Sequence, residues 1–518
     1  MQRLPNPDPV RLEIYRHQLS ALTEEMGAAL RRAAYSPNIK ERRDYSCAVF
    51  DGDGRVIAMG DYMPVHLGAM PMSVAAALAF ASPLRPGDVV ALNDPFAGGT
   101  HLPDITLVSA AYAGAEPIAH LAVRAHHADV GGIAAGSMPL AREIYQEGLR
   151  LPPVRLFSAG RRNEDVWRMI LANVRTPVER EGDLAAQGAS LTTGERRMGE
   201  LVARRGADEV RGAMAALLAY ADRLVRKGIG LIPDGEYEAE DVLEDDGFGG
   251  GPYPIRVRLA VSGDELTADF DGSAPQAPGG INAVSAITSS CTRYVVRCVL
   301  EPLLAETLPA GGGAMDAVHM RLPEGTVVNA RPPAAVAAGN VEASQRITDV
   351  LLSAFARALP RLMPAQSQGT MNNLALGGID PRTEAPFAYY ETAAGGMGAG
   401  PSGPGLSAVH CHMTNSLNTP VEALEHAYPL RIRRYEIRRG SGGAGRHRGG
   451  DGLRRDVELL ADADVSLLTE RRTRAPAGLA GGGPGAPGEN VLLRDGRESA
   501  VPAKTTVRCR AGDTLSIR

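Results

Sequence analysis

The stretch from residue 87 to residue 129 constrains the fold most, because three strand-like apolar runs follow one another there with short connections. The runs are GDVVALND (87–94), DITLVSAAYA (104–113) and PIAHLAVRAHHAD (117–129). Short apolar runs that end at turn-forming residues are typical of β-strands. We therefore expect the segment NDPFAGGTHLPD (93–104) to form the loop between two strands and RAHHAD (124–129) to end the third.

These two polar segments collect chemically reactive side chains, although the whole chain has only 11 histidines. His126 follows His101 by 25 residues (126 minus 101), which is enough to run out along one strand and back along its neighbour. Two imidazoles and the carboxylate of Asp104 can then meet at one edge of a sheet. Such a set binds Zn, Mn or Fe and leaves positions open for water and substrate, as Lewis-acid catalysis requires.

The residues alone leave several alternatives open. Strand alternation does not choose between His126 and His127, which lie on opposite faces of one run. Asp94 and Asp129 lie next to the candidate ligands, where a carboxylate can orient an imidazole or act as a general base. Equally, Asp94 is placed to cap the turn at Pro95, and the histidines can simply hydrogen-bond to loop carbonyls.

The rest of the chain mixes helical and strand-like patterns without a regular βαβ order. Helices are expected over 9–34, from about 70 to 81, within 164–227, and over 289–304 and 343–359. A hairpin is expected over 44–60 and strands over 253–272, while the last ninety residues form glycine-punctuated β-like segments. The pattern predicts an α+β fold of several lobes, with mixed sheets and helices and a β-rich C-terminal region.

This pattern also predicts how the chain is divided. We expect an N-terminal α+β lobe with the metal site (1–160), a helical insertion (161–235), a central α+β lobe (236–430) and a β-rich C-terminal lobe (431–518). A chain of 518 residues is long enough to build several hydrophobic cores.

Charge and cysteine content argue against several classes of protein. The formal net charge is −5 and no long run of Lys or Arg occurs, so the basic surface needed to bind nucleic acid is missing. Five scattered cysteines without a C-x-x-C pair indicate a reducing compartment, so we expect a cytoplasmic protein. The N-terminal segment has charges and prolines where a signal peptide is apolar, and we expect no membrane-spanning segment.

Two glycine-rich stretches, GSGGAGRHRGGDG (440–452) and LAGGGPGAPG (479–488), raise the question of phosphate binding, because successive backbone N–H groups can cradle an anion. They lack the G-x-x-x-x-G-K-[ST] motif, so turns in a β-rich lobe are the better interpretation. Four nearby arginines either face a phosphorylated molecule or a partner, or form a solvated surface: Arg446, Arg448, Arg454 and Arg455. Since no ATP-binding motif occurs, any ATP that the reaction uses must be bound by another chain.

Three other histidines lie in short motifs of their own. His66, in VHLGAM, can approach the site, but a lone histidine before a helix is more often structural. His410 and His412, in VHCHMTN, alternate like a pair of metal ligands, yet no third ligand stands near them in the sequence.

Seven blocks of the sequence, in the same order and over nearly the whole chain, resemble the hydantoinase B/oxoprolinase family. They are NIKERRDYSCAVFD (38–51), HLGAMPMSV (66–74), NDPFAGGTHLPD, RAHHADVGG (124–132), YETAAGGMGA (390–399), SGGAGRHRGG (441–450) and LAGGGPGAPG. Several blocks in series are far more specific than any one of them.

The resemblance implies a B-type subunit with a divalent metal, working with a separate A-type subunit of actin-like ATPase fold that binds ATP and phosphorylates an oxygen of the substrate. It implies His101, Asp104 and His126 as the ligands, and so favours His126 over His127, which becomes a neighbour of the site. Two loops depart from the family pattern, 307–315 and 400–405, which puts substrate contacts there in doubt.

The family includes ATP-dependent hydantoinases and oxoprolinases, lactamases such as caprolactamase, and carboxylases of acetone and acetophenone. We therefore expect a hetero-oligomeric, ATP-dependent cyclic amide hydrolase that opens a hydantoin, 5-oxoproline or a related ring, with Asp94, His127 and Asp129 as candidate catalytic residues. The enzymatic alternative is a subunit of an ATP-dependent ketone carboxylase. The non-catalytic alternative is a scaffold subunit whose histidines are structural.

Overall fold

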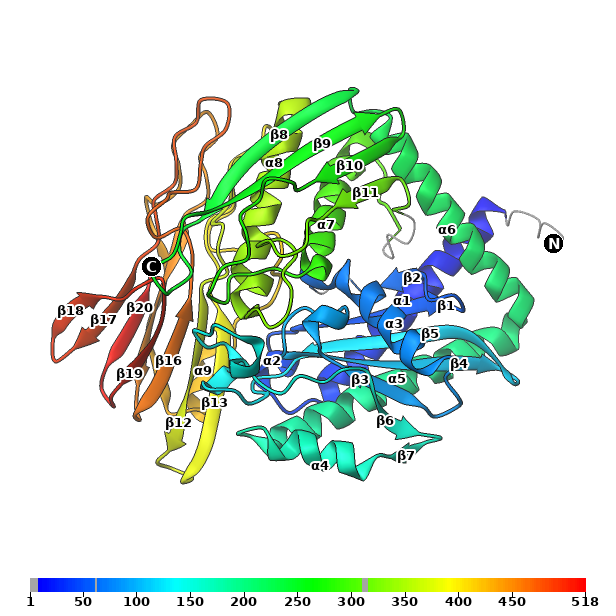
Figure 1. Ribbon diagram of the computed structural model, residues 1–518, viewed down its shortest axis with the longest axis horizontal. Helices are drawn as coiled ribbons and strands as arrows, with labels where there is room; N and C mark the ends of the chain where they lie inside the picture. Colours follow the sequence, from blue (N-terminus) through cyan, green and yellow to red (C-terminus); the bar gives the residue numbers. More distant parts are fainter. Residues whose placement is uncertain (1–7, 61–62, 310–314) are drawn as a thin grey trace.

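The computed structural model describes residues 8–60, 63–309 and 315–518. Within these ranges the strands form four sheets, of seven, four, four and five strands, with helices packed against them (Figure 1). This mixture of helices and several sheets confirms the predicted α+β class, and the last two sheets make the C-terminal region β-rich. The division into four lobes stays a prediction.

The seven-stranded sheet has the order β2-β1-β5-β4-β3-β6-β7. Its strands are β1 (Tyr45–Asp51), β2 (Val56–Met59), β3 (Val89–Leu92), β4 (Asp104–Ala113), β5 (Glu116–His126), β6 (Val154–Ser158) and β7 (Arg161–Arg162). The hairpin expected over 44–60 is β1–β2, and the three strand-like runs are β3, β4 and β5. Both faces of β4 and β5 are buried, which explains why these strands are almost continuously apolar.

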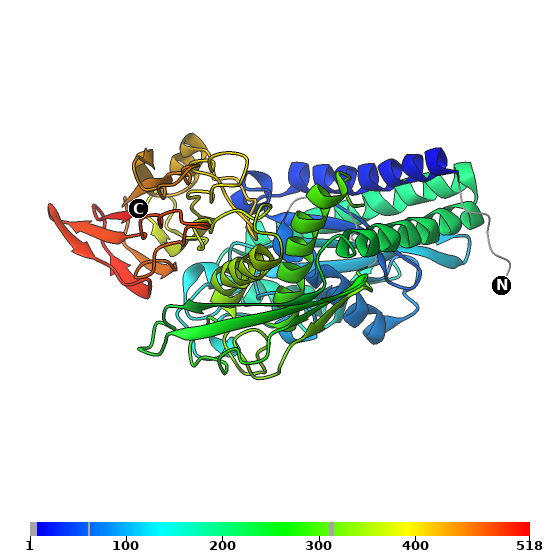
Figure 2. The ribbon, with the colours of Figure 1, turned by 90° about the horizontal axis from the view of Figure 1, so that it is seen from above.

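Helices cover both faces of this sheet. The helices α1 (Pro9–Ala33) and α5 (Pro177–Arg205) pack against each other and against one face, with α6 (Ala207–Ile229) beside them (Figure 2). On the opposite face, α3 (Ala69–Ala81) packs against β3 and β4. The first helix begins as expected, because the Asp8 carboxylate accepts a hydrogen bond from the Val10 N–H at 3.3 Å and Pro9 lies in the first turn.

The second sheet has the order β11-β10-β9-β8 and holds the predicted strands of the 253–272 region. Its strands are β8 (Gly235–Leu243), β9 (Tyr253–Ser262), β10 (Glu265–Asp269) and β11 (Val318–Arg321). Helix α7 (Ser285–Leu304) packs against α8 (Ser344–Ala358), and α8 lies on β8 and β9. One turn of π-helix, η5 (Gly339–Ala343), precedes α8, and such turns are frequent at functional positions.

The C-terminal region forms the remaining two sheets, of order β13-β12-β16-β19 and β14-β15-β20-β17-β18. Their strands are β12 (Asn373–Asp380), β13 (Ala385–Thr392), β14 (Leu430–Arg438), β15 (Gly452–Leu459), β16 (Ala463–Leu468), β17 (Asn490–Arg494), β18 (Arg497–Ala500), β19 (Lys504–Cys509) and β20 (Thr514–Ile517). The shorter helices of the chain are α2 (Pro37–Lys40), η1 (Pro64–His66), η2 (Pro95–Ala97), η3 (Ala135–Ser137), η4 (Ile144–Gln146), α4 (Glu164–Ala172) and α9 (Val421–Ala427).

One segment of the described chain passes a simple length and composition test for a membrane span. Residues Pro64–Ala81 are long and apolar enough to do so by length and composition, and half of the segment is buried inside the protein. It includes α3, which packs against β3, β4 and α7, so core packing accounts for its composition.

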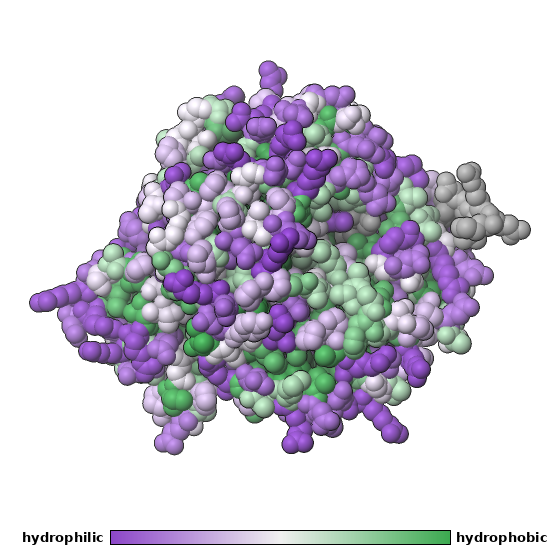
Figure 3. Space-filling model, viewed as in Figure 1, coloured by the Kyte–Doolittle hydropathy of each residue, from purple (hydrophilic) through white to green (hydrophobic). Residues whose placement is uncertain are grey.

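The face of the molecule in Figure 3 carries many hydrophilic side chains along its outline.

Candidate metal centre

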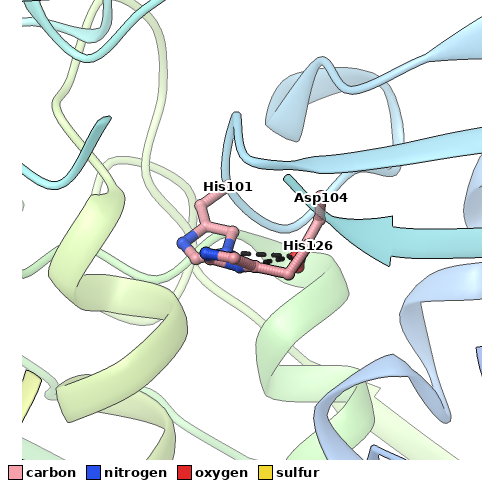
Figure 4. Close-up of side chains that lie close together, drawn as sticks. All are labelled: His101, Asp104 and His126. Carbon is pink, nitrogen blue, oxygen red and sulfur yellow. Dashed lines mark hydrogen bonds and ion pairs between the residues drawn. The ribbon is translucent and has the colours of Figure 1, made fainter. Parts of the chain in front are cut away.

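Strands β4 and β5 bring Asp104 and His126 opposite each other. Asp104 is the first residue of β4 and His126 the last of β5, and the two are direct partners in the antiparallel ladder. His101 lies in the loop just before β4. The expected path, out along one strand and back along its neighbour, thus places these three side chains together, pointing toward one another (Figure 4).

The three candidate ligand atoms form a nearly equilateral triangle. His101 Nε2 lies 3.1 Å from His126 Nδ1, and each nitrogen lies 3.2 Å from Asp104 Oδ1. Three ligands at about 2.1 Å from one ion are separated by about 3.0 Å in octahedral and about 3.4 Å in tetrahedral geometry. The donor set and its spacing therefore fit one divalent cation, and all three side chains are buried.

Neighbouring groups hold the Asp104 carboxylate in place. Its second oxygen, Oδ2, accepts a hydrogen bond from the Thr100 hydroxyl and lies 3.5 Å from His66 Nε2. His66 is oriented in turn by a 2.9 Å contact between its Nδ1 and the Ser46 hydroxyl. Burial opposes ionisation of Asp104, but His101, His126 and His66 together hold the pKa of this carboxyl well below its usual range.

Burial also acts on two imidazoles beside Asp104, those of His66 and His126. Burial lowers the pKa of both His66 and His126, and the contacts with Asp104 only partly oppose that effect. A neutral ring offers a lone pair to a cation, so burial favours the form of His126 that can coordinate a metal.

Residues distant in the sequence complete the wall of this centre. Asn340, in the π-turn before α8, places its side-chain nitrogen 3.1 Å from His101 Nε2. Tyr390, on β13, stacks on His126 with ring centroids 4.5 Å apart. The Arg42 guanidinium lies over the Tyr390 ring, 5.0 Å from its centroid. Neither Asn340 nor Tyr390 was among the site residues predicted from the sequence; only the sequence block that begins at Tyr390 pointed to this segment.

The glycine pair in the loop before β4 has a steric role. Gly98 has a φ of +89°, and a Cβ atom there would lie 2.5 Å from the backbone carbon of Met72 at the start of α3. The Gly98 carbonyl accepts a hydrogen bond from the Ser73 hydroxyl at 2.6 Å. The loop therefore packs backbone to backbone on α3, which fixes the position from which His101 reaches the centre.

The three other predicted site residues lie close by but outside the triangle. Asp94 caps η2 by accepting from the Phe96 N–H at 3.0 Å, as the turn-capping alternative predicts. His127 points to the other side of the sheet, where its Nε2 lies 2.9 Å from the side-chain oxygen of Gln187 on α5. Asp129 accepts from the backbone of Gly131, Gly136 and Arg175 and from the Arg175 guanidinium.

The remaining candidates have other surroundings. His412 Nε2 lies 4.0 Å from Asp349, and burial lowers the pKa of His410 and of His412 to about 4; neither joins the triangle. Arg448, Arg454 and Arg455 pair with Asp451, Asp456 and Glu391 respectively. Of the departing loops, 310–314 lies outside the described residues.

Comparison with known proteins points to one family. The model of the family described as hydantoinase B/oxoprolinase matches residues 8–518. The caprolactamase subunit beta of Pseudomonas jessenii is 33% identical over 530 residues, covering 98% of this chain and 89% of that protein. The 5-oxoprolinase 1 of Arabidopsis thaliana is 36% identical over 535 residues, and the match covers 98% of this chain but only 41% of that longer protein.

Solved structures agree with these sequence relationships. The crystal structure of the ATP-dependent caprolactamase from Pseudomonas jessenii superposes with a TM-score of 0.90 at 29% identity, covering 98% of this chain and 90% of that one. A nucleotide-free acetone carboxylase structure also gives a TM-score of 0.90, at 18% identity, over 100% of this chain and 75% of that one. The second likeness shows a shared fold.

Proposed function

The chain belongs to the hydantoinase B/oxoprolinase family, and we propose that it is the metal-bearing subunit of an ATP-dependent cyclic amide hydrolase. One observation carries the proposal: His101 Nε2, His126 Nδ1 and Asp104 Oδ1 converge in a buried triangle with edges of 3.1 to 3.2 Å. The chain spans less than half of the length of the 5-oxoprolinase that it matches.

We assign each residue of the centre a role. His101, Asp104 and His126 would hold a divalent ion such as Zn, Mn or Fe, which when bound would supply Lewis acidity toward an amide carbonyl. Thr100 and His66 fix the Asp104 carboxylate and Tyr390 stacks on His126, while Asn340 stands beside the ligand atom of His101 and so borders the position of the ion.

The division of work between two chains follows from amide chemistry. An amide carbonyl is a weak electrophile and its nitrogen a poor leaving group, so phosphorylating the carbonyl oxygen makes the carbon easier for water to attack. An A-type ATPase subunit would carry out that phosphorylation, in a hetero-oligomer with this chain. Hydantoins, 5-oxoproline and related lactams are the proposed substrates.

The other candidate residues take supporting roles in this proposal. His127 would tie the end of β5 to α5 through Gln187, and Asp94 and Asp129 would hold the two loops beside the centre. The five cysteines are free thiols, which fits the cytoplasmic location that we propose.

Metal analysis and activity together test the proposal. The chain, purified with its A-type partner, should contain one equivalent of divalent metal and open a hydantoin, 5-oxoproline or caprolactam ring only with ATP. His101→Ala should lose both the metal and the activity, while His120→Ala, on the same strand β5 but outside the triangle, should keep both.

Three outcomes would redirect the assignment. ATP-dependent carboxylation of acetone without ring opening would favour the carboxylase alternative, whose support is the fold shared with acetone carboxylase. A folded, metal-free wild-type chain would favour the scaffold alternative. Full activity and metal content in His101→Ala would remove His101 from the centre.

A further inference from the structure

A large cavity lies among the glycine-rich loops of the C-terminal region, apart from the metal centre. Its volume is about 820 Å³, and its walls come from the segments 360–372, 394–401, 438–453 and 471–488, with Arg518. The loops that the sequence analysis interpreted as turns therefore enclose a space large enough for a small organic molecule.

The lining of this cavity is strongly one-sided in charge. Six arginines and one histidine line it, and no Asp or Glu side chain does so in the described part of the chain. The arginines are Arg361, Arg438, Arg446, Arg471, Arg472 and Arg518. A concave surface lined by cations and no carboxylate creates a positive potential, so it favours an anionic ligand.

Three of these arginines lack a carboxylate partner. Arg361 and Arg446 are exposed and make no hydrogen bond or ion pair with any residue that the structure describes. The Arg472 guanidinium binds only neutral oxygens: the Glu470 carbonyl and the side-chain amides of Asn372 and Asn490. The positive charges of Arg361 and Arg446 are thus available to a ligand.

Arg446 differs in this respect from its neighbours in the sequence. Arg448, two residues later, pairs with Asp451 at 2.8 Å and is absent from the lining. Of these two arginines of one loop, Arg446 therefore lines the cavity, whereas Arg448 is held by a carboxylate.

Two of the lining residues, Gln368 and Arg471, contain buried polar atoms that have no partner among the described residues. Gln368 Oε1 and Arg471 Nε are both buried and unsatisfied among the described residues, although the rest of the Arg471 guanidinium pairs with Asp241 and Asp349. Unsatisfied buried polar atoms are rare in folded proteins, and a bound polar ligand or water is one way to satisfy them.

The glycines of the walls let the loops pack very closely on one another. A Cβ on Gly396 would lie 2.0 Å from the Gly450 carbonyl oxygen, and one on Gly442 would lie 2.0 Å from that of Gly449. The loops therefore pack backbone against backbone, and only glycine fits there.

We propose that this cavity binds a small molecule that carries a phosphoryl group. Arginine forks recognise the tetrahedral oxygens of phosphate bidentately, and the cavity holds far more than one phosphate ion, so an organic portion fits beside it. Met363, Met397, Leu453 and Leu479 offer apolar surface for that portion. Because no Phe, Tyr or Trp of the described chain lines the cavity, it lacks a platform for stacking a nucleotide base.

Two sources can supply this chemistry: a phosphorylated small molecule or inorganic phosphate. The first would be a product of a kinase-type step, and the second a product of ATP hydrolysis. The assignment does not depend on the metal centre, since none of the residues of that centre lines the cavity.

Binding of simple probes to the full chain tests the site. Titration calorimetry at constant ionic strength should compare inorganic phosphate, phenyl phosphate, phenol, succinate and ATP. We expect saturable binding of phosphate or phenyl phosphate at one site, with no binding of phenol and weaker binding of succinate and ATP. Tighter binding of phenyl phosphate identifies an organic phosphate as the ligand class, and equal affinity identifies inorganic phosphate.

Variants locate the binding in the cavity. The double variant Arg361→Ala/Arg446→Ala removes two exposed arginines without internal partners, so it should fold normally and weaken phosphoryl binding at least about tenfold. The matched control Arg448→Ala removes an equally exposed arginine of the same loop and should change the affinity less than twofold.

Three results would overturn the proposal. No saturable binding of either phosphate probe, stronger binding of succinate than of both, or unchanged affinity in the double variant would each exclude it. His101→Ala should leave phosphoryl binding intact, so a failed metal centre and a failed cavity site give different results.

Discussion

Asp104 uses both carboxylate oxygens, one toward the two histidines and one toward Thr100 and His66. A carboxylate held from behind in this way cannot rotate away from a cation, and supporting groups of this kind tune metal affinity. The centre therefore depends on Thr100 and His66, which contact Asp104 Oδ2 rather than the candidate ligand atom Oδ1.

Replacing Thr100 by Val tests that dependence at a single residue. Val keeps the shape but removes the hydroxyl that donates to Asp104 Oδ2, so the affinity for divalent metal should fall by about 10- to 100-fold. Competition with a fluorescent chelator measures the affinity. Thr193→Val, on α5 and distant from the centre, should leave it unchanged; an equal loss in both variants would show a general effect of the substitution.

Tyr390 has two separable contacts. Its hydroxyl donates to Asn373 Oδ1 at 2.7 Å, while its ring stacks on His126. Tyr390→Phe should lose about 1 to 3 kcal/mol of unfolding free energy, because the Asn373 oxygen loses its buried donor, yet keep its metal. Tyr390→Leu should lose metal affinity as well. Urea unfolding and metal analysis separate the two, and metal loss in the Phe variant would contradict a role for the ring alone.

At the level of elements, the antiparallel pair β4–β5 determines where the centre forms. The ladder runs from Ala113 opposite Glu116 to Asp104 opposite His126, so the last pair of the ladder is also a ligand pair. A register shift of one residue would place His127 opposite Asp104 and turn the wrong histidine toward the site. The buried apolar side chains on both faces of these strands hold the register.

Gly98→Ala tests the loop that leads into this pair. The added Cβ would lie 2.5 Å from the α3 backbone, and position 98 has a positive φ. The steric clash therefore adds to the backbone strain, so the variant should lose more unfolding free energy than the strain alone would cost, and it should lose metal. Gly114→Ala is the matched control: its φ is +65° and no atom lies within 4 Å of the added Cβ, so only the strain of about 1 to 2 kcal/mol remains. Equal unfolding free energies for the two variants would refute the packing argument.

Across the whole molecule, buried carboxyls join segments that are far apart in the sequence. Glu147 accepts from the N–H groups of Val336 and Ala337, both at 2.8 Å, and so links the N-terminal sheet region to the segment that leads into α8. Burial raises the pKa of Glu147 from 4.5 to about 8, although those hydrogen bonds partly oppose the rise. The folded protein therefore binds a proton that the unfolded chain releases.

This linkage predicts a pH dependence of stability. Since the folded pKa lies above the unfolded one, Glu147 makes stability fall as pH rises from about 4.5 to about 8, with a slope of at most about 1.4 kcal/mol per pH unit. Glu147→Gln cannot ionise, so its unfolding free energy should fall less steeply over this range. Urea unfolding at pH 6 and pH 8 measures the difference, and an identical slope in both proteins would contradict the raised pKa.

The sequence by itself determined the local elements and the family. Apolar runs and turn residues predicted β3, β4 and β5, the β1–β2 hairpin and the opening helix, because these features depend on neighbours within a few residues. The spacing of His101, Asp104 and His126 predicted that they can meet, and the ordered blocks indicated the family that the comparisons show.

Only the tertiary structure decided the rest. Strand alternation has a period of two and left His126 and His127 open; the resemblance favoured His126, and the structure shows where His127 lies instead, against Gln187 of α5 on the other side of the sheet. Asn340 and Tyr390 reach the centre across more than 200 residues of chain, and the arginine-lined cavity forms from four separate segments. Such contacts are set by how elements pack, which no local pattern encodes.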